Sequence, residues 1–555
     1  MKNKIIRVFL LITFLFSVIT TLKSQTWAWV QSGTCTSDAI GIGVCADAAG
    51  NVYEVGAFNS PTLLIGTTTL TNSLGYEPFI VKYDASGNVI WARTSNSTFN
   101  DFQANAVCTD GTGNVFMLGT YGASMIAFGS FTLNYGGGSN IFLVKYDPNG
   151  NVLWAKNTKG LSQIAQKITC DRNGNVFMSG NYNGPTCIFD TYTLTSTGSQ
   201  DVFLAKYDSN GNVLWARGSK GTTYDNGWSV STDSIGNSFF SGFYTSPSIT
   251  FGTYTLTNSG GSGSAFLVKY DANGNILWAQ TSNGLTSWSY AQGYSVSSDA
   301  IGNTYLGGSY GGQIAFGTYS LNVGTIRYVL WKFDTNGNVI WARTPNNLYN
   351  APNSQGYAVS TNGINTFVSG VFTDTLYVGT YTLVPQAGAT LPMYIVEYDA
   401  NGNVLFATEL PSGGSNHQNY TYVDNACNFY FASDFRGSPT ALTIGTSTLI
   451  QTGSKNPIVA KLSNNCLSSG INEGVIRSSF SLYPNPNNGS FILQVDSKSD
   501  RCEMHIFNSL GQKVYERNLI SGINSIKATT LNEGLYHYII FEDKMQTRSG
   551  KFIIE

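Results

Sequence analysis

Charged side chains are scarce in this chain of 555 residues: Asp, Glu, Lys and Arg together make up 11% of it. The formal net charge is −2 at pH 7, so we expect no basic surface for nucleic acid. Three histidines occur (His417, His505 and His537), and there is no His-Glu-x-x-His, Cys-x-x-Cys or Gly-x-Ser-x-Gly motif. Since metal centres and catalytic triads are built from such parts, the sequence predicts no catalytic residue, no metal site and no cofactor.

Cysteine is also sparse, with eight residues in the whole chain, too few for a small domain held together by disulfides. Cys45, Cys108 and Cys170 stand at similar places in successive repeats, one or two residues before an Asp. We interpret them as small buried apolar side chains rather than as bridges. Pairing of Cys35 with Cys45, or of Cys427 with Cys466, stays open, because spacing alone does not fix geometry.

Long apolar runs are missing after the first 24 residues. Lys2, Lys4 and Arg7 precede an apolar stretch from Val8 to Ile19, which is shorter than the ~20 residues that a membrane-spanning helix needs. Residues 1–24 are therefore predicted to be a secretory signal peptide. The alternative is an uncleaved anchor helix, and no later segment is expected to span a membrane.

Glycine and aromatic residues are plentiful, and the aromatics recur at a fixed period. There are 61 glycines, and aromatics make up 13% of the chain. Equivalent aromatic residues follow one another at intervals of 61 to 65 residues: Trp29, Trp91, Trp154, Trp215, Trp278, Trp341 and Phe406. A long, regular period of this kind is typical of an array or a β-propeller.

Each repeat carries four strand-like runs, as in residues 104–156. Two of the connections have the pattern Asp-x-x-Gly-Asn, for example Asp110–Asn114 and Asp147–Asn151. In a type I turn the Asp side chain caps the turn and the Gly takes the left-handed position that closes it. A calcium loop is the alternative, but it needs more carboxylates and a distal Glu.

Seven copies of a Phe-Gly-type connection, from Ile65-Gly66 to Ile444-Gly445, predict seven blades. The seventh repeat lacks a fourth strand, while a spare strand lies at Thr26–Val30. We expect this N-terminal strand to complete the last blade and close the ring, which would remove two open sheet edges. The predicted class is all-β: a seven-bladed β-propeller with four-stranded blades over residues 25–466.

The segments Phe203–Ala216 and Phe266–Ala279 closely resemble the seven-bladed β-propeller repeat family of bacterial secreted proteins. The resemblance covers residues 26–466 and implies the fold, but little about activity, because propellers have many functions. A second resemblance, to quinoprotein-type propellers, implies eight blades rather than the seven counted.

The repeat pattern ends at Cys466, and a different sequence pattern follows. Residues 467–478 are predicted to be a polar linker, and residues 479–555 a small Ig-like β-sandwich. The last segment resembles the type A C-terminal sorting domain of the type IX secretion system of Bacteroidetes. The motif positions are Tyr483, Pro484, Asn485, Pro486, Gly489, Gly511, Gly534, Tyr536 and Lys551. The resemblance implies recognition by the secretion machinery, export, and a secreted or cell-surface location; an ordinary Ig-like module is the alternative.

Two Trp residues, Trp228 and Trp288, have no place in the repeat, and Tyr224 and Tyr290 lie beside them. They fall in the variable connections, on the face opposite the uniform turns, where binding is usually placed. We therefore predict a binding site for glycan or protein at these four residues; local packing is the alternative. Glu54 could line the channel, but one acid is no catalytic pair. A non-enzymatic binding or adhesion protein is favoured over a glycosidase or lyase and over a structural surface component.

Overall fold

The computed structural model describes residues 25–72, 75–97, 102–122, 125–134, 138–259, 261–346, 353–385, 392–410, 420–436, 441–463, 481–483, 488–495, 502–508, 512–542 and 545–554. Every regular element in these ranges is a β-strand, so the predicted all-β class is confirmed. Within the same ranges, no helix is long and apolar enough to span a membrane. The predicted signal peptide and the linker lie outside the described residues. The chain forms two compact units, Met1–Cys466 and Leu467–Glu555.

Seven sheets in the described part of the first unit are built on four antiparallel strands, which pair in chain order in the first six. The first three sheets consist of β3 (Ala39–Ala46), β4 (Val52–Phe58), β7 (Glu77–Tyr83) and β8 (Val89–Thr94); β10 (Phe102–Thr109), β11 (Val115–Tyr121), β14 (Asn140–Tyr146) and β15 (Val152–Asn157); β17 (Gln163–Cys170), β18 (Val176–Tyr182), β21 (Asp201–Tyr207) and β22 (Val213–Lys220). The next three consist of β23 (Asp225–Thr232), β24 (Ser238–Tyr244), β27 (Ser264–Tyr270) and β28 (Ile276–Thr281); β30 (Tyr290–Ser298), β31 (Thr304–Phe316), β32 (Tyr319–Phe333) and β33 (Val339–Arg343); β34 (Ser354–Thr361), β35 (Asn365–Phe372), β38 (Met393–Asp399) and β39 (Val404–Leu410).

The remaining sheet takes its strands from both ends of the unit. Strands β40 (Tyr420–Val423), β41 (Phe429–Phe435) and β44 (Asn456–Ser463) are joined by β1 (Thr26–Ser32). Strand β1 pairs with β44 in antiparallel register, with Thr26 opposite Ser463 and Ser32 opposite Ile458. The N-terminal strand therefore covers an edge of β44 that would otherwise present unpaired backbone groups.

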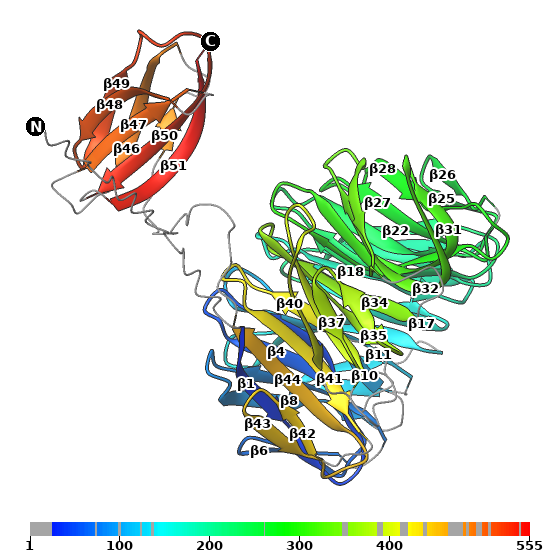
Figure 1. Cartoon of the computed structure of the whole chain (residues 1–555). Coiled ribbons are helices and arrows are strands. Elements are labelled where there is room, and N and C mark those ends of the chain that lie inside the picture. Colours follow the sequence, from blue (N-terminus) through cyan, green and yellow to red (C-terminus); the bar gives the residue numbers. More distant parts are fainter. Residues whose placement is uncertain are drawn as a thin grey trace, which may run out of the picture. The chain divides into compact units, whose positions relative to one another are not determined.

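The sheets of the first unit follow one another in chain order (Figure 1), and their first strands lie side by side around a central channel. Each contacts the first strand of the next sheet, from β3 through β10, β17, β23, β30 and β34 to β40, and β40 contacts β3. Apolar side chains fill the spaces between sheets; Phe116 and Leu118 of one sheet, for example, share a buried cluster with Ile168 and Met178 of the next. This β-propeller arrangement is the one that the repeats predict.

The uniform turns have the predicted geometry. In the turn after β14, Asp147 Oδ1 accepts hydrogen bonds from the backbone N–H groups of Asn149 and Asn151, at 2.8 Å each. Gly150 has φ of +81°, which L side chains rarely adopt. The carboxylate is thus used within its own turn. Within the described residues no group of three or more His, Cys, Asp or Glu side chains is arranged to hold a metal ion.

The repeated Trp and Lys residues bind each sheet to the following one. Trp215 Nε1 and Lys206 Nζ both donate to the carbonyl of Ala272, at 3.2 and 3.1 Å, in the turn between β27 and β28 of the next sheet. The same contact recurs at the other repeats, with Trp Nε1–O distances of 3.1–3.3 Å, from Trp29 onto Ala85 to Trp341 onto Ala400. The repeat signature thus encodes contacts between blades as well as the turn itself.

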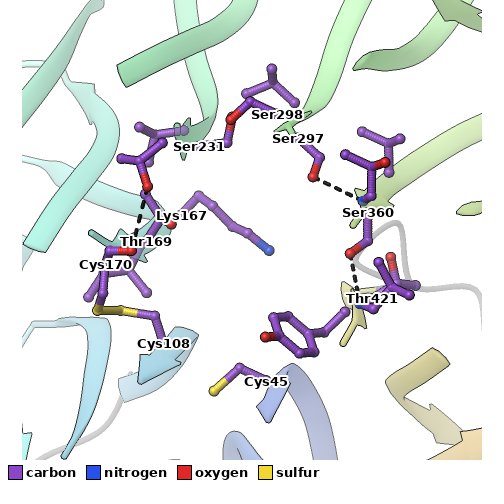
Figure 2. Close-up of a pocket in the computed structure, with 18 of the residues that line it drawn as sticks. Cys45, Cys108, Lys167, Thr169, Cys170, Ser231, Ser297, Ser298, Ser360 and Thr421 are labelled. Atoms are coloured by element: carbon purple, nitrogen blue, oxygen red, sulfur yellow. Dashed lines mark hydrogen bonds between the residues drawn. A yellow bond between two sulfur atoms is a disulfide. The ribbon is translucent and has the colours of Figure 1, made fainter. Parts of the chain in front are cut away.

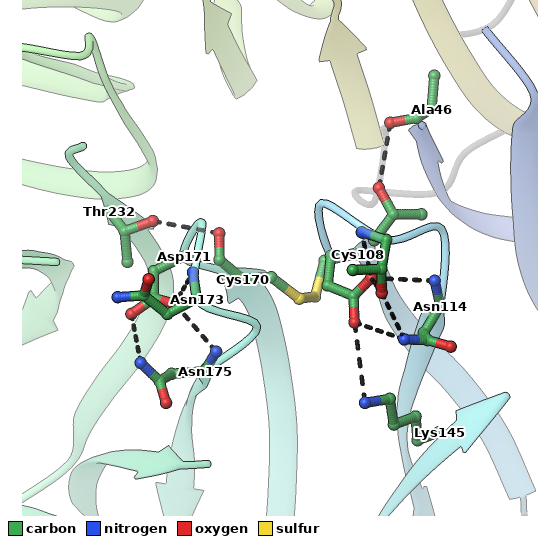
Figure 3. The surroundings of a disulfide bond; sticks show 12 residues. Ala46, Cys108, Asn114, Lys145, Cys170, Asp171, Asn173, Asn175 and Thr232 are labelled. Atoms are coloured by element: carbon green, nitrogen blue, oxygen red, sulfur yellow. Dashed lines mark hydrogen bonds and ion pairs between the residues drawn. A yellow bond between two sulfur atoms is a disulfide. The ribbon is translucent and has the colours of Figure 1, made fainter. Parts of the chain in front are cut away.

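One cysteine prediction was wrong. Cys108 and Cys170, which end neighbouring inner strands, form a disulfide with a Cα–Cα distance of 6.1 Å (Figure 3). Cysteines at equivalent positions of adjacent inner strands lie close enough to form a disulfide. The interpretation as separate buried side chains did not take this proximity into account. Cys35 and Cys45 are free buried thiols and do not pair. Cys427 is disulfide-bonded; its expected partner, Cys466, lies outside the described residues.

The second unit contains two sheets facing a common core. One has the order β45 (Ser481–Tyr483), β46 (Ser490–Val495), β49 (Gly522–Lys527); the other has β48 (Lys513–Leu519), β47 (Cys502–Phe507), β50 (Gly534–Glu542), β51 (Met545–Ile554). Of the motif residues, Gly489 has φ of +83°, Gly534 has φ of +152°, and Tyr536 stacks on Phe552 at 5.7 Å. Pro484, Asn485, Pro486 and Gly511 lie outside the described residues, as do the side chains of Tyr483 and Lys551.

Candidate functional site

A β-bulge recurs at the same place in the inner strands of six sheets. It falls between Gly41 and Gly43 in the first sheet and between Gly227 and Ser229 in the fourth, and it is found at the equivalent residues of β10, β17, β30 and β34. A bulge leaves one residue out of the ladder and redirects its side chain. Each of these six strands thus has one residue beside the channel that does not pair with the neighbouring strand, and these residues occupy equivalent positions.

In three successive sheets the bulged residue is aromatic. Trp228 stacks on Tyr294 with ring centroids 4.5 Å apart and an interplanar angle of 22°. Tyr294 meets the edge of Tyr357 at 5.2 Å, and Trp228 also stacks on Phe243 of its own sheet at 5.9 Å. These rings form a continuous aromatic surface across three blades. The corresponding positions in the first two sheets hold Ile42 and Asn105, which are buried.

Trp288 and Tyr290 extend this surface outward. Both rings lie over Gly311: a Cβ atom at that glycine would come within 2.7 Å of Tyr290 Cε1 and 3.2 Å of Trp288 Cζ3. Burial, with smaller contributions from Tyr294 and Tyr357, raises the pKa of the Tyr290 hydroxyl. Trp288 remains 44% exposed. We name Trp228, Trp288, Tyr290, Tyr294 and Tyr357 the aromatic cluster.

Two amide side chains flank the cluster. The hydroxyl of Tyr294 donates to Gln292 Oε1, and that of Tyr357 donates to Gln355 Oε1. With each Oε1 accepting a tyrosine proton, the Nε2 groups of both glutamines remain as donors, and neither donates to another described residue. Polar donors beside aromatic faces suit a ligand that has both apolar faces and hydroxyl groups.

The structure brings together three of the four predicted binding residues. Trp228, Trp288 and Tyr290 belong to the cluster, whereas Tyr224 occupies the place equivalent to Tyr290 one sheet earlier. Tyr224 is 52% exposed and makes no ring contact among the described residues. Tyr294 and Tyr357 were missed, although the sequence contains a signal for them. Trp228, Tyr294 and Tyr357 each lie five residues before the first residue of the following turn, which is Asp233, Asp299 and Asn362, respectively.

The acids near the inner strands are buried structural groups. Asp225 has no exposed surface and accepts hydrogen bonds from the Ser246 hydroxyl at 3.0 and 3.1 Å; burial raises its pKa to about 6. Glu54, considered as a channel residue, is 2% exposed and accepts a hydrogen bond from the Tyr83 hydroxyl at 2.7 Å. Neither carboxyl is placed to meet a substrate.

A chamber of ≈ 290 Å³ lies at the end of the inner strands nearer the uniform turns (Figure 2). All seven inner strands contribute to its wall, and Lys167 points into it. Sequence reasoning missed Lys167, yet a signal was present. Four residues before the turn position, the first six sheets other than that of Lys167 have Gly43, Ala106, Ser229, Ser295 and Ala358, and the seventh has Tyr420. A cationic side chain at this place therefore departs from the pattern.

Comparison with known proteins identifies the C-terminal segment. Residues 481–555 match the family model of the secretion system C-terminal sorting domain. The predicted type IX sorting domain is therefore confirmed, and with it export to a secreted or cell-surface location. A sorting domain of this kind interacts with the type IX secretion machinery.

The propeller has more distant likenesses. An uncharacterised WD repeat-containing protein of Acanthamoeba polyphaga mimivirus is 27% identical over 451 residues, which cover 67% of this chain and 32% of that protein; the chain thus spans about a third of that relative. A Bacteroides caccae protein of unknown function aligns over 60% of this chain and 89% of its own, with 10% identity and a TM-score of 0.29. PorZ of Porphyromonas gingivalis, a surface component of its type IX secretion system, aligns over 93% and 81%, with 8% identity and a TM-score of 0.20.

Proposed function

We propose that this exported propeller is a non-enzymatic carbohydrate-binding protein that uses the aromatic cluster as its platform. The observation that carries the proposal is the contact between rings of three adjacent blades: Trp228 stacks on Tyr294, Tyr294 meets the edge of Tyr357, and Trp288 at the margin remains 44% exposed. Sugar rings present C–H faces that pack on aromatic faces and hydroxyls that accept from amides, and Gln292 and Gln355 supply such amides.

The surroundings of the cluster support binding rather than hydrolysis. Hydrolysis of a glycosidic bond requires two carboxyl groups about 5–10 Å apart that both reach the substrate. Asp225 is fully buried and held by Ser246. The aromatic stack, in contrast, is already packed in its final conformation, so ligand binding would order few side chains.

The test measures binding of the full secreted chain to a panel of bacterial and plant polysaccharides, followed by calorimetry on any ligand found. We expect Trp288→Ala and Tyr290→Ala each to weaken binding at least tenfold, which corresponds to about 1.4 kcal/mol. Ile301→Ala is the matched control, because Ile301 is 74% exposed in a uniform turn at the other end of its strand. Tyr224→Ala shows whether the site also includes this exposed ring, which directly precedes the strand of Trp228.

Four results would count against the proposal. Equal loss of binding in the Ile301 and Trp288 variants would remove the aromatic cluster as the site. Binding of surface proteins with no polysaccharide would favour a protein partner. New reducing or unsaturated ends after incubation with polysaccharide would establish a glycosidase or lyase, and a surface phenotype without any ligand would favour a structural component.

A further inference from the structure

The chamber near the uniform turns is distinct from the aromatic cluster in position and chemistry. Its wall consists of the ends of the inner strands together with Asn362 and Asn425. The volume of ≈ 290 Å³ is close to the lower limit of about 300 Å³ for small-molecule sites. It can hold a ligand of monosaccharide size or smaller.

Serine hydroxyls line one side of the chamber and are oriented by the next blade. Ser297 Oγ accepts from the backbone N–H of Thr361 at 3.1 Å, and Ser360 Oγ accepts from that of Val423 at 2.8 Å (Figure 2). Neither of these two hydroxyls donates to another described residue, so their protons are available to a ligand. These two serines can thus donate hydrogen bonds to a ligand in the cavity.

Lys167 is the one charged side chain among the described residues of the wall. Burial lowers the pKa of its ammonium group to about 8, with Cys45 acting in the opposite direction. The titratable groups that face it are Cys45 on β3 and Tyr422 on β40, and burial raises the pKa of both, with Asp47 contributing in the same direction. Cys108 and Cys170 form a disulfide and do not titrate, while β23, β30 and β34 contribute hydroxyls.

We propose that the chamber binds a small oxyanion, with the Lys167 ammonium and the Ser297 and Ser360 hydroxyls as its donors. An oxyanion accepts hydrogen bonds only, which matches a wall that offers donors and a positive charge and contains no described carboxylate. A carboxylate of a sugar acid and an inorganic sulfate share this chemistry. Because Lys167 and the inner-strand residues enclose the chamber, an ion pair inside it is less screened by salt than one at the surface.

The experiment titrates the full-length protein by calorimetry with sodium D-galacturonate, sodium sulfate and neutral D-galactose at constant ionic strength. We expect saturable binding of at least one anion and none of galactose. The first two arms decide whether a carboxylate or an inorganic oxyanion is preferred. Affinity should fall as the pH rises above 8, approaching tenfold per pH unit, because the ligand binds the protonated amine.

Lys167→Met keeps an unbranched side chain of nearly the same length and removes its charge, and we expect it to weaken anion binding at least tenfold. Lys220→Met, which removes an exposed lysine, should leave binding unchanged. Calorimetric unfolding checks that both variants are folded; if Lys167→Met is not, the pH dependence of the wild-type protein decides. The proposal would be overturned if no anion binds at about 10 mM ligand, which would be half-saturating for a Kd of about 10 mM. It would also be overturned if the affinity does not change between about pH 6.5 and 9.

Discussion

The contact between each repeat Trp and the following blade gives a sharp prediction at Trp215. Its indole Nε1 donates to the Ala272 carbonyl at 3.2 Å, and its ring stacks on Tyr270 at 6.1 Å and covers Gly274. Trp215→Phe keeps an aromatic ring but removes the donor. The chain itself has a phenylalanine, Phe406, at the same repeat position in its sixth sheet. The next sheet has no turn between its third and fourth strands, because β44 and β1 come from opposite ends of the unit.

The size of the effect follows from the lost contacts. A hydrogen bond of this kind contributes about 0.5–1.5 kcal/mol, and the carbonyl keeps Lys206 as a second donor. We therefore expect a loss of about 1 kcal/mol for Trp215→Phe and about 3–5 kcal/mol for Trp215→Ala, which also empties a core position. With an unfolding entropy near 2.1 cal/mol/K per residue, a propeller of this length should lose about 1 °C in Tm per kcal/mol.

Differential scanning calorimetry of the full chain measures both changes against Phe406→Trp. The phenylalanine position has no turn carbonyl to accept a hydrogen bond, so introducing an indole there should not raise Tm. The reasoning is refuted if Trp215→Phe unfolds at the wild-type temperature, or if Phe406→Trp stabilises the protein by as much as Trp215→Phe destabilises it.

Two further predictions concern buried groups of the propeller. Burial raises the pKa of Glu54 to about 7, against the opposing Tyr83 hydrogen bond; the unfolded chain therefore releases this proton at lower pH than the folded one, and stability should fall by up to about 3 kcal/mol as the pH rises from 4.5 to 7. Urea unfolding at pH 5 and pH 8 measures this decrease in stability for the wild type and for Glu54→Gln. The decrease should be smaller in Glu54→Gln, and an equal decrease in both proteins would contradict the prediction. Removal of the Cys108–Cys170 disulfide, which spans 62 residues, should cost about 4 kcal/mol by loop entropy. Cys108→Ser should lower Tm by about 4 °C in calorimetry, and a Tm equal to that of the wild type would argue against the bridge.

The repeating framework could be predicted because its signals are local and occur many times. Asp147 and Gly150 specify a turn by their own side-chain and backbone chemistry, and each copy of the signature strengthens the assignment. The confirmed sorting domain was recognisable for a similar reason, since its motif residues keep a fixed order. Trp215 was correctly placed in the repeat, but its hydrogen bond to the next blade was not foreseen, because it joins residues 57 positions apart.

The candidate site was only partly predictable because it depends on deviations between blades. Trp228 was singled out as an aromatic outside the repeat, whereas Tyr294 and Tyr357 escaped notice because neither stands out in its own sequence context. Only the bulge in each inner strand places these rings at one level. Lys167 and the Cys108–Cys170 bridge required the same comparison by position across blades rather than a search for motifs within one.

The pairing of β1 with β44 makes completion of the propeller a test of chain integrity. Thr26 meets Ser463, so the final sheet cannot form until nearly the whole unit has been made available. A truncated chain, or one cut within an early blade, keeps an exposed strand edge, and such edges promote aggregation and proteolysis. In an exported protein, an incomplete propeller is therefore expected to be less soluble than an intact one.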